Sequence, residues 1–361
     1  MKIRCKSMLG TSHSWAITVR SLLKQFLIKE HDLYLMSING FDLLDKDLIE
    51  LIDRGEPKSF DLDLSYTQPG NFKTRFLKKS NLKLAIYNYE SSILPKKWSD
   101  SHKYIDYVLP SSEYTKNVFL NAGWPEEKCL VIPHGIDLSL FETKSKYPLR
   151  TKKKFKFLNV SIPHYRKNID LVIRAYYDLF CEEDDVCLVI KTNIEKKENA
   201  EYEYDFLTML SGLQKEYLSK KKLPQVEIVH EKIGNMAALY NACDVLVSAT
   251  SGEGFGLPLL EGLASNMVVI APRATGQVDF LNDNNSLLYE ANEMLADRRY
   301  QYISYHPEAT VFMPSFEELK KNMEYAYDNF DFLKLKFEKP SKEICNKLTW
   351  SHVADQILNI S

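Results

Sequence analysis

Two carboxylates and two glycines punctuate the stretch SGEGFGLPLLEG, which runs from residue 251 to residue 262. Glu253 falls in a loop, whereas Glu261 falls in the helix that follows, because Pro258 suits a first helical turn in which one N–H needs no partner. The glycines let backbone amides come close to a ligand just before that helix. The stretch therefore predicts a loop carboxylate, exposed N–H groups and a second carboxylate two turns further in. This arrangement suits a phosphorylated ligand with hydroxyl groups at both ends, such as a nucleotide-sugar.

Two cations precede another predicted helix, in the stretch IPHYRKNIDLVIRAYYDLF from 162 to 180. Arg166 and Lys167 lie at the mouth of that helix, where fixed positive charges and the helix dipole together stabilise an anion. We interpret the pair as a clamp for a diphosphate that needs no metal ion. An alternative stays open, in which both side chains are merely exposed on the surface.

Strand-like and helix-like segments alternate along the chain, which is typical of parallel sheets built from βαβ units. The predicted strands form two series, first KIRCKSM, LYLMSI, LKLAIYN and YIDYVLP, then FKFLNVS, VCLVIKT, VEIVHE, DVLVSAT and MVVIA. Helices are predicted to begin near Ser14 and after Ser111 or Ser112, and Gly123 and Asn266 are predicted to end two helices. The pattern predicts an α/β protein with two doubly wound, Rossmann-like domains, whose ligands bind at the carboxyl ends of the strands.

The boundary between the two series lies near PHGID, residues 133–137, and the basic stretch after it. We predict an N-terminal domain over 1–140, a C-terminal domain over 141–345 and a closing helix over 346–361 that packs on the N-terminal domain. The closing segment has apolar residues at helical spacing, as a packing helix requires.

The composition is that of a globular two-domain protein. The chain has 361 residues, of which 45% are hydrophobic and 27% charged. No stretch approaches the roughly 18 apolar residues of a membrane span. The six cysteines are scattered without a CxxC pair, which favours buried free thiols in a reducing compartment. We therefore predict a cytoplasmic protein.

The charge is divided between the two halves. Residues 1–150 carry 22 lysines and arginines against 18 acidic residues, and the remainder carries 25 against 31. A basic cluster lies in the first half, formed by Lys73, Arg75, Lys78, Lys79 and Lys83. It is either a solvated helix face or a peripheral contact with anionic lipid headgroups at the inner face of the membrane. Nothing in the sequence indicates nucleic-acid binding.

The stretch around the two glutamates resembles the signature of retaining glycosyltransferases of family 4, in which seven residues separate two glutamates. Glu253 matches the first glutamate and Glu261 the second, and ALYNACDVLVSAT, residues 238–250, is similar to the family's approach to this motif. VIPHGIDLSLF resembles the family's interdomain segment, and LTWSHVADQILNI resembles its closing helix. The resemblance implies the GT-B fold, in which two Rossmann-like domains face each other across a cleft. The first domain would bind the acceptor and the second the nucleotide-sugar.

The same resemblance implies transfer of a hexose or related sugar from a nucleotide-diphosphate sugar to a glycan, lipid-linked or other hydroxyl acceptor, as in polysaccharide biosynthesis. The anomeric configuration would be retained, and the diphosphate would take the acceptor's proton. Glu261 would accept hydrogen bonds from the ribose, Glu253 would hold the donor sugar, and Lys167 would touch the diphosphate with Arg166 beside it. The remaining donor contacts would be Gly10, Gly254, Phe255, Gly256 and Leu257. No metal or other cofactor would be required, in agreement with histidines and cysteines that lack ligand spacing.

Two positions depart from the family's pattern. Many members have a Val-Gly-Arg phrase where this chain has Val-Ser-Ile at 160–162, so Arg166 is the only arginine nearby. Many members have a histidine where this chain ends a strand with Asn88, Tyr89 and Glu90. Glu90 is either a sugar or acceptor contact or an ordinary loop carboxylate, and His13 either contacts the ligands or caps a helix.

Two other functions stay open beside the transferase. A nucleotide-sugar epimerase shares two Rossmann-like domains, and a non-catalytic subunit could keep the donor pocket while needing a partner. Release of free nucleoside diphosphate only when an acceptor is present would distinguish a transferase from an epimerase.

Overall fold

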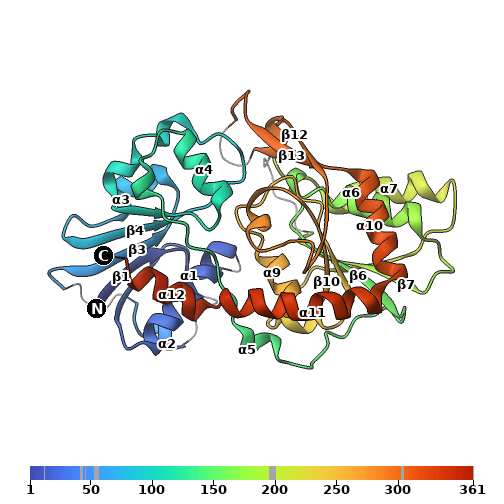
Figure 1. The fold of residues 1–361 in the computed structure, drawn as a ribbon, viewed down its shortest axis with the longest axis horizontal. Helices are drawn as coiled ribbons and strands as arrows, with labels where there is room; N and C mark the ends of the chain where they lie inside the picture. Colours follow the sequence, from blue (N-terminus) through green and yellow to red (C-terminus); the bar gives the residue numbers. More distant parts are fainter. Residues whose placement is uncertain are drawn as a thin grey trace. The chain divides into compact units, whose positions relative to one another are not determined.

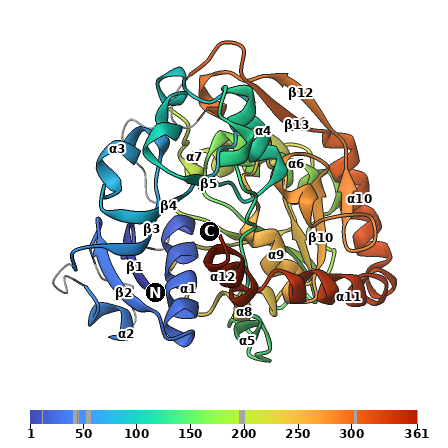
Figure 2. The same cartoon turned by 60° about the vertical axis from the view of Figure 1, so that its left-hand side comes forward.

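The structure is a computed structural model, which describes residues 1–11, 13–40, 44, 46–52, 57–194, 201–301 and 305–360. The chain forms two compact units, each built around a parallel sheet (Figures 1 and 2). Unit 1 comprises Met1–Tyr89, Ile93–Asp137 and Lys347–Ser361, and unit 2 comprises Glu90–Ser92 and Leu138–Asn346. The chain therefore leaves unit 1 three residues before the predicted boundary at 140, and the short segment Glu90–Ser92 belongs to unit 2.

The sheet of unit 1 has five parallel strands in the order β2-β1-β3-β4-β5. Four of them were predicted, namely β1 (Lys2–Ser7), β2 (Asp32–Ser37), β4 (Ser80–Ile86) and β5 (Tyr107–Leu109). The fifth, β3 (Phe60–Tyr66), was missed because Asp61 and Asp63 interrupt its apolar pattern. Asp63 is buried, and Arg4 Nη1 donates to its two carboxylate oxygens at 2.9 and 3.1 Å. Burial raises the pKa of Asp63, and the Arg4 charge opposes that rise.

The helices of unit 1 are α1 (Ser14–Ile28), the short α2 (Lys46–Ile49) and α3 (Phe72–Arg75), α4 (Glu113–Asn121) and α12 (Trp350–Leu358). The sequence predicted the start of α1, the start and end of α4 and the closing helix of unit 1, but it missed the two short helices. Ser112 caps α4 by accepting a hydrogen bond from the Thr115 N–H at 3.2 Å. Gly123 follows α4 with a φ of +83°, the left-handed conformation that a glycine adopts without strain.

The C-terminal helix α12 packs against α1 within unit 1. Lys29 Nζ lies 2.7 Å from Asp355 Oδ1, and the Ile136 N–H donates to the Leu348 carbonyl at 2.7 Å. Gly135 is required beside this junction, because a Cβ there would lie 2.6 Å from the Trp350 nitrogen. The glycine of the PHGID stretch thus allows the C-terminal segment to approach closely.

The sheet of unit 2 has six parallel strands in the order β11-β10-β9-β6-β7-β8. They are β6 (Phe155–Val160), β7 (Val186–Lys191), β8 (Gln225–Val229), β9 (Val245–Val247), β10 (Val268–Pro272) and β11 (Leu287–Tyr289). The sequence predicted all of these strands except β11. It also missed the antiparallel pair β12 (Ala291–Leu295) and β13 (Thr310–Pro314), whose first strand is mostly exposed and carries no buried apolar alternation.

The helices of unit 2 cover both faces of this sheet. They are α5 (Leu138–Phe141), α6 (Ile169–Leu179), α7 (Phe206–Leu218), α8 (Met236–Tyr240), α9 (Leu257–Ala264), α10 (Phe316–Asp328) and α11 (Phe330–Lys347). One face packs against α6, α7, α10 and α11 in a single apolar core. The opposite face packs closely against α9. A Cβ on Gly262 of that helix would lie only 2.6 Å from the Leu246 side chain and 3.3 Å from the Val269 side chain. Helices on both faces of a parallel sheet make unit 2 doubly wound, as predicted.

The cysteines are free, and five of the six are buried, as the sequence predicts. Burial raises the pKa of the Cys5 thiol to about 12. Within the described ranges, no helix is both long enough and apolar enough to span a membrane.

Candidate active site

The predicted loop and helix lie at the carboxyl end of β9. Gly256 stands at the N-terminus of α9 with a φ of +99°, and Pro258 lies in the first turn of the helix. Asn266 follows the end of α9 with a φ of +55°, which confirms it as the stop of the helix. The glycine, the proline and the asparagine therefore have the local roles that their residue types predict.

A neighbouring turn fixes the backbone around Glu253. The Glu253 N–H donates to Thr275 Oγ1 at 2.9 Å, and the Gly276 N–H donates to the Glu253 carbonyl at 2.9 Å. A Cβ on Gly276 would lie 2.3 Å from the Gly254 carbonyl oxygen, so only glycine fits there. Thr275 and Gly276 are therefore part of the site, and no residue pattern in the sequence indicated that they would be.

The Arg166–Lys167 turn lies beside this loop because β6 and β9 are paired neighbours in the parallel sheet. Both residues belong to a single 3-10 turn, Tyr165–Lys167, that leads into α6. The Ser251 N–H donates to the Arg166 carbonyl at 2.7 Å. The Asn168 side-chain amide donates to the Ala249 carbonyl at 2.8 Å and to Ser251 Oγ at 2.7 Å. The Arg166–Lys167 turn and the loop that carries Glu253 are thus joined by one backbone hydrogen bond and by the Asn168 side chain.

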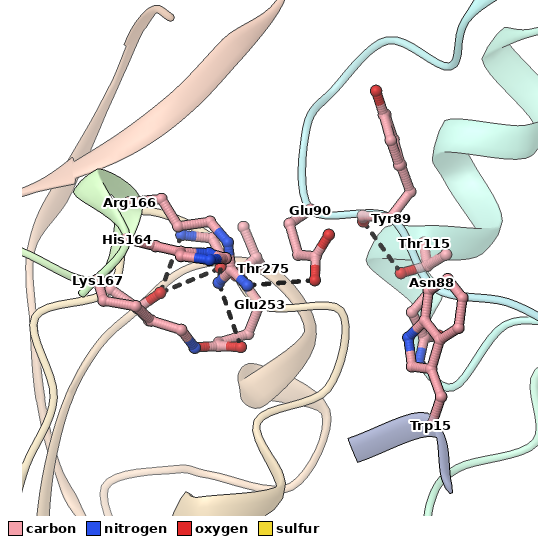
Figure 3. Close-up of polar contacts among 12 residues, drawn as sticks. Trp15, Asn88, Tyr89, Glu90, Thr115, His164, Arg166, Lys167, Glu253 and Thr275 are labelled. Atoms are coloured by element: carbon pink, nitrogen blue, oxygen red, sulfur yellow. Dashed lines mark hydrogen bonds and ion pairs between the residues drawn. The ribbon is translucent and has the colours of Figure 1, made fainter. Parts of the chain in front are cut away.

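Four charged side chains meet between these loops, as Figure 3 shows. Lys167 Nζ donates to Glu253 Oε1, and Arg166 Nη1 lies 3.5 Å from Glu253 Oε2. Arg166 Nη2 donates to Glu90 Oε1 at 3.3 Å, and Arg166 Nη1 donates to the Gly252 carbonyl at 2.5 Å. The structure therefore brings together Arg166, Lys167 and Glu253 with Glu90, which the sequence left open as either a sugar or acceptor contact or a loop carboxylate. We call Glu90, Arg166, Lys167 and Glu253 the charge quartet.

Burial and mutual attraction set the ionisation of the quartet. The side chains of Arg166, Lys167 and Glu253 are only 12–14% exposed. Burial lowers the pKa of Lys167, and the neighbouring Arg166 charge lowers it further. Burial alone would raise the pKa of Glu253, but the Lys167 and Arg166 charges outweigh it and bring that pKa below its usual range. Glu253 is therefore an ionised carboxylate held by two cations.

Glu90 lies in the short segment Glu90–Ser92, which packs with unit 2. Its carbonyl oxygen lies 2.7 Å from the position that a Cβ on Gly252 would occupy, so Gly252 is needed for this approach. The Thr310 N–H donates to Ser92 Oγ at 2.8 Å and fixes the other end of the segment. Nothing in the sequence spacing indicated that Glu90 and Arg166 would pair.

A pocket in unit 2 opens beside the quartet. It is lined by Ser161, Lys167, Glu253, Gly256 and Pro258, among others. The pocket thus combines a lysine, a carboxylate and the N-terminus of an eight-residue helix. A helix N-terminus and a lysine both favour an anion.

The loop from Gly254 to Gly256 is packed into unit 2. Gly254, Phe255 and Gly256 are buried, and the Phe255 ring lies 4.9 Å from the Phe280 ring, centroid to centroid. The Phe255 side chain therefore serves the core, which leaves only its backbone for contact with a ligand. Leu257, the first residue of α9, is half-buried.

Glu261 lies on α9, two residues after the pocket-lining Leu259, and has a partner that the sequence did not reveal. Tyr240 Oη donates to Glu261 Oε2 at 2.6 Å. Burial raises the pKa of Glu261 to about 7, although the Tyr240 hydrogen bond opposes that rise. This carboxylate therefore titrates near neutral pH, where the usual glutamate is fully ionised.

The unit 1 residues predicted for the site have local partners. Gly10 is buried, and Asn39 Oδ1 accepts hydrogen bonds from the Leu9 N–H at 2.9 Å and the Gly10 N–H at 3.2 Å. His13 caps α1, because its Nδ1 accepts from the Trp15 N–H at 3.2 Å. Of the two alternatives for His13, helix capping is the one that the structure shows.

The strand end that departs from the family's pattern is mostly interior. Asn88 is buried, accepts hydrogen bonds from the Ser111 N–H and hydroxyl at 2.8 Å, and donates to the Tyr66 hydroxyl at 3.0 Å. Asn88 Nδ2 also lies 3.1 Å from His134 Nε2, and burial lowers the pKa of His134 to about 3. His134 is therefore a neutral interior residue. Figure 3 includes Asn88 and Thr115, whose hydroxyl donates to the Tyr89 carbonyl at 3.5 Å.

Across the part of the chain that the structure describes, no group of three or more histidine, cysteine, aspartate or glutamate side chains could hold a metal ion. The charged residues of the candidate site are instead paired with one another.

The sequence profile of a known family, described as "Glycosyl transferases group 1", matches residues 141–312. This match covers a little less than half of the chain. The matched segment contains three members of the charge quartet as well as Glu261 and Tyr240.

Two curated proteins are similar to the chain. One, named "Probable sucrose-phosphate synthase" from Thermosipho melanesiensis, is 24% identical over 300 residues, which are 78% of this chain and 60% of that protein. The other, named "Alpha-monoglucosyldiacylglycerol synthase" from Streptococcus pneumoniae, is 31% identical over 180 residues, which are 46% of this chain and 37% of that protein. The chain thus spans less than two thirds of the length of either relative.

Solved structures share the fold over nearly the whole chain. A glycosyltransferase from Rickettsia africae superposes with a TM-score of 0.74 at 17% identity, covering 99% of this chain and 97% of that one. Anabaena HepE, solved with UDP and glucose, has a TM-score of 0.70 at 14% identity, covering 99% and 98%. The predicted fold class, α/β with two Rossmann-like units as in GT-B glycosyltransferases, is therefore confirmed.

Proposed function

We propose that this protein is a retaining glycosyltransferase whose unit 2 binds a nucleotide-diphosphate sugar. The observation that carries the proposal is the pocket where Lys167 and the N-terminus of α9 meet Glu253. A diphosphate needs fixed positive charge and N–H donors, and a sugar needs a carboxylate that accepts from hydroxyl groups. Both requirements are met within one pocket at the carboxyl ends of β6 and β9.

Each member of the site receives a role in this proposal. Lys167 and the backbone N–H groups of residues 254–257 hold the diphosphate. Glu253 accepts hydrogen bonds from the donor sugar and favours the positive charge that develops at its anomeric carbon. Glu261 accepts the ribose hydroxyls. Preorganised donors aimed at the departing diphosphate supply most of the stabilisation of the transition state.

Donor binding requires one exchange of partners. Glu253 and Lys167 are bonded to each other, so the diphosphate replaces Glu253 on Lys167 while the sugar hydroxyls replace Lys167 on Glu253. The exchange leaves neither buried charge without a partner, which keeps its cost low. Arg166 stays on Glu90 and the Gly252 carbonyl and holds the loop while the exchange proceeds.

The proposed chemistry is transfer with retention, in which the acceptor hydroxyl attacks from the face that the diphosphate leaves and gives its proton to that diphosphate. No metal or cofactor enters this proposal. The printed titles of the HepE structures name UDP and UDP-glucose, which makes UDP-sugars the first donors to test. A glycan or a lipid-linked alcohol is the proposed acceptor. The proposed location is cytoplasmic, with peripheral contact to the inner membrane face through the basic cluster of unit 1.

The first test is a thermal-shift screen against UDP-, GDP- and ADP-sugars. A ligand at 100 times its dissociation constant stabilises the fold by about 2.7 kcal/mol. We expect a shift with one nucleotide class, which is lost in Glu261→Ala and kept in Glu216→Ala, whose carboxylate pairs with Arg174 on α6. A folded protein that responds to no donor would contradict the proposal.

A turnover assay separates the remaining functions. A transferase releases nucleoside diphosphate only when an acceptor is present. An epimerase changes the sugar of the donor with no acceptor, and a non-catalytic subunit binds the donor and releases nothing.

A further inference from the structure

The outer side of the Arg166–Lys167 turn is covered by two segments to which the proposed mechanism gives no role. One is Glu201–Tyr204 and the other is the turn Arg298–Tyr300. Neither contains a residue of the glutamate motif, and both contact residues 164–168. Their contacts determine where the backbone of Lys167 lies.

The first segment binds the turn by one side-chain hydrogen bond and two backbone hydrogen bonds. His164 Nε2 lies 2.9 Å from Glu203 Oε1, and the two side chains are only 8% and 9% exposed. The Tyr165 N–H donates to the Tyr202 carbonyl, and the Tyr204 N–H donates to the Pro163 carbonyl, both at 3.0 Å. A pair this well buried holds its geometry far better than an exposed pair, because solvent does not screen it.

The second segment covers the same turn through a cation and a hydroxyl. The Arg299 guanidinium lies 5.1 Å from the centroid of the Tyr165 ring, and the Tyr204 ring lies 5.2 Å from it. Tyr300 Oη donates to Asn168 Oδ1 at 3.4 Å. Tyr165 is therefore packed by both segments at once.

The turn needs such support because its backbone is not in a relaxed conformation. Asn168 has a φ of +46° and a ψ of 47°, the left-handed region that is unfavourable for most residues with a side chain and that asparagine tolerates better than most. The Lys167 N–H donates to the His164 carbonyl at 2.9 Å, so His164 and Lys167 are the two ends of one hydrogen-bonded turn. The backbone positions of His164 and Lys167 are therefore linked by this hydrogen bond.

We infer that Glu203 is a positioning residue, which holds the Arg166–Lys167 turn through His164 so that Lys167 Nζ points into the pocket. The consequence for ligands rests on the proposed function, because Lys167 is the proposed diphosphate contact. Glu203 does not touch the ligand in this inference. Its effect on affinity therefore passes through Lys167 alone.

A double-mutant cycle with UDP as the probe tests this coupling. Glu203→Ala is expected to weaken UDP binding, measured by calorimetry, about threefold to tenfold, which lies in the lower part of the range of coupling between residues in one network. In the Lys167→Ala background the same substitution is expected to change the UDP dissociation constant little. Equal losses in both backgrounds would show that Glu203 acts only on general stability and would overturn the inference. Glu203→Gln, which keeps an acceptor oxygen for His164, is expected to restore most of the affinity, and serves if Glu203→Ala does not fold.

Hydrogen exchange separates this inference from the proposed function. Without ligand, the amide protons of Lys167 and Asn168 are expected to exchange faster in Glu203→Ala than in the wild-type protein or in Glu216→Ala, whose ion pair lies between α6 and α7. Unchanged exchange at those two amides would overturn the positioning role even if UDP binds. Faster exchange in a protein that binds no nucleotide would support the positioning role and contradict only the proposed function.

Discussion

The protonation of Glu261 leads to a prediction about stability and donor binding between pH 5 and 8. Burial raises the pKa of this carboxyl from an ordinary 4.5 to about 7 in the folded protein. Between those two values the folded state binds more protons than the unfolded state, so the free energy of unfolding falls as the pH rises. A shift of this size corresponds to roughly 3 kcal/mol in the free energy of unfolding, at 1.36 kcal/mol per pKa unit. This stabilisation is present at low pH and is fully lost above about pH 7.

The assay is urea unfolding of the wild-type protein and Glu261→Gln at half-unit pH steps. Glutamine keeps an acceptor oxygen for the Tyr240 hydroxyl but cannot ionise. The wild-type protein is therefore expected to lose stability relative to Glu261→Gln as the pH rises from 5 to 7. A difference between the two proteins that stays constant over this range would refute the reasoning, because Glu261 would then not titrate there.

Donor binding should respond in the opposite direction. In the proposed complex the ribose hydroxyls donate hydrogen bonds to Glu261, which favours the ionised carboxylate, so binding below pH 7 is expected to release a proton from Glu261. The affinity for a UDP-sugar is expected to fall up to tenfold for each pH unit below 7 in the wild-type protein and to change little in Glu261→Gln. Calorimetry in buffers of different ionisation enthalpy measures the released proton directly. The absence of proton release at pH 6 would exclude Glu261 as the ionised acceptor.

Three further predictions concern the loops of the candidate site. Lys167→Ala is expected to lower kcat/KM by about 10²–10³ because it removes a charged contact to the leaving diphosphate, and an unchanged rate in a steady-state assay would exclude that contact. Gly276→Ala is expected to lower the free energy of unfolding by about 1–3 kcal/mol, since its Cβ meets a backbone oxygen at 2.3 Å. Its control, Gly212→Ala in α7, has nothing within 4 Å and is expected to be neutral or stabilising, as urea unfolding would show. Glu90→Gln is expected to tighten UDP binding about tenfold by calorimetry, because the quartet gains one net positive charge; weaker binding would mean that Glu90 is needed to hold Arg166 in place.

Local residue types were sufficient to predict the frame of the site. Gly256, Pro258 and Asn266 each need one backbone conformation, and each stands where the sequence places it. The Arg166–Lys167 turn could be assigned to the same edge of the sheet as Glu253, because loops after parallel strands meet at the carboxyl ends. These inferences depend on neighbours along the chain or on the regularity of a βαβ sheet, and both kinds of information can be read from the sequence.

The partners of the site residues could not be predicted in the same way. Tyr240 and Glu261 are 21 positions apart, and Arg166 and Glu90 are 76 apart. No periodicity links such pairs, because their contact depends on how complete helices and loops pack. Strand β3 was missed for a related reason, since Asp63 reads as a surface residue until Arg4 is known to lie beside it. A buried charge is hidden in a sequence whenever its partner lies far along the chain.

Arg166 contacts one of the two positions at which the sequence departs from the resembling family's pattern. The chain has Glu90 after the strand where many members have a histidine. The Arg166 guanidinium pairs with Glu90, the Gly252 carbonyl and Glu253 at the same time. An arginine so engaged is better suited to holding two loops than to following a ligand, since a buried guanidinium that left its carboxylates would leave their charges uncompensated. Lys167 has a flexible side chain and one carboxylate partner that a sugar can replace, so it is the member of the quartet best able to exchange its partner for a diphosphate.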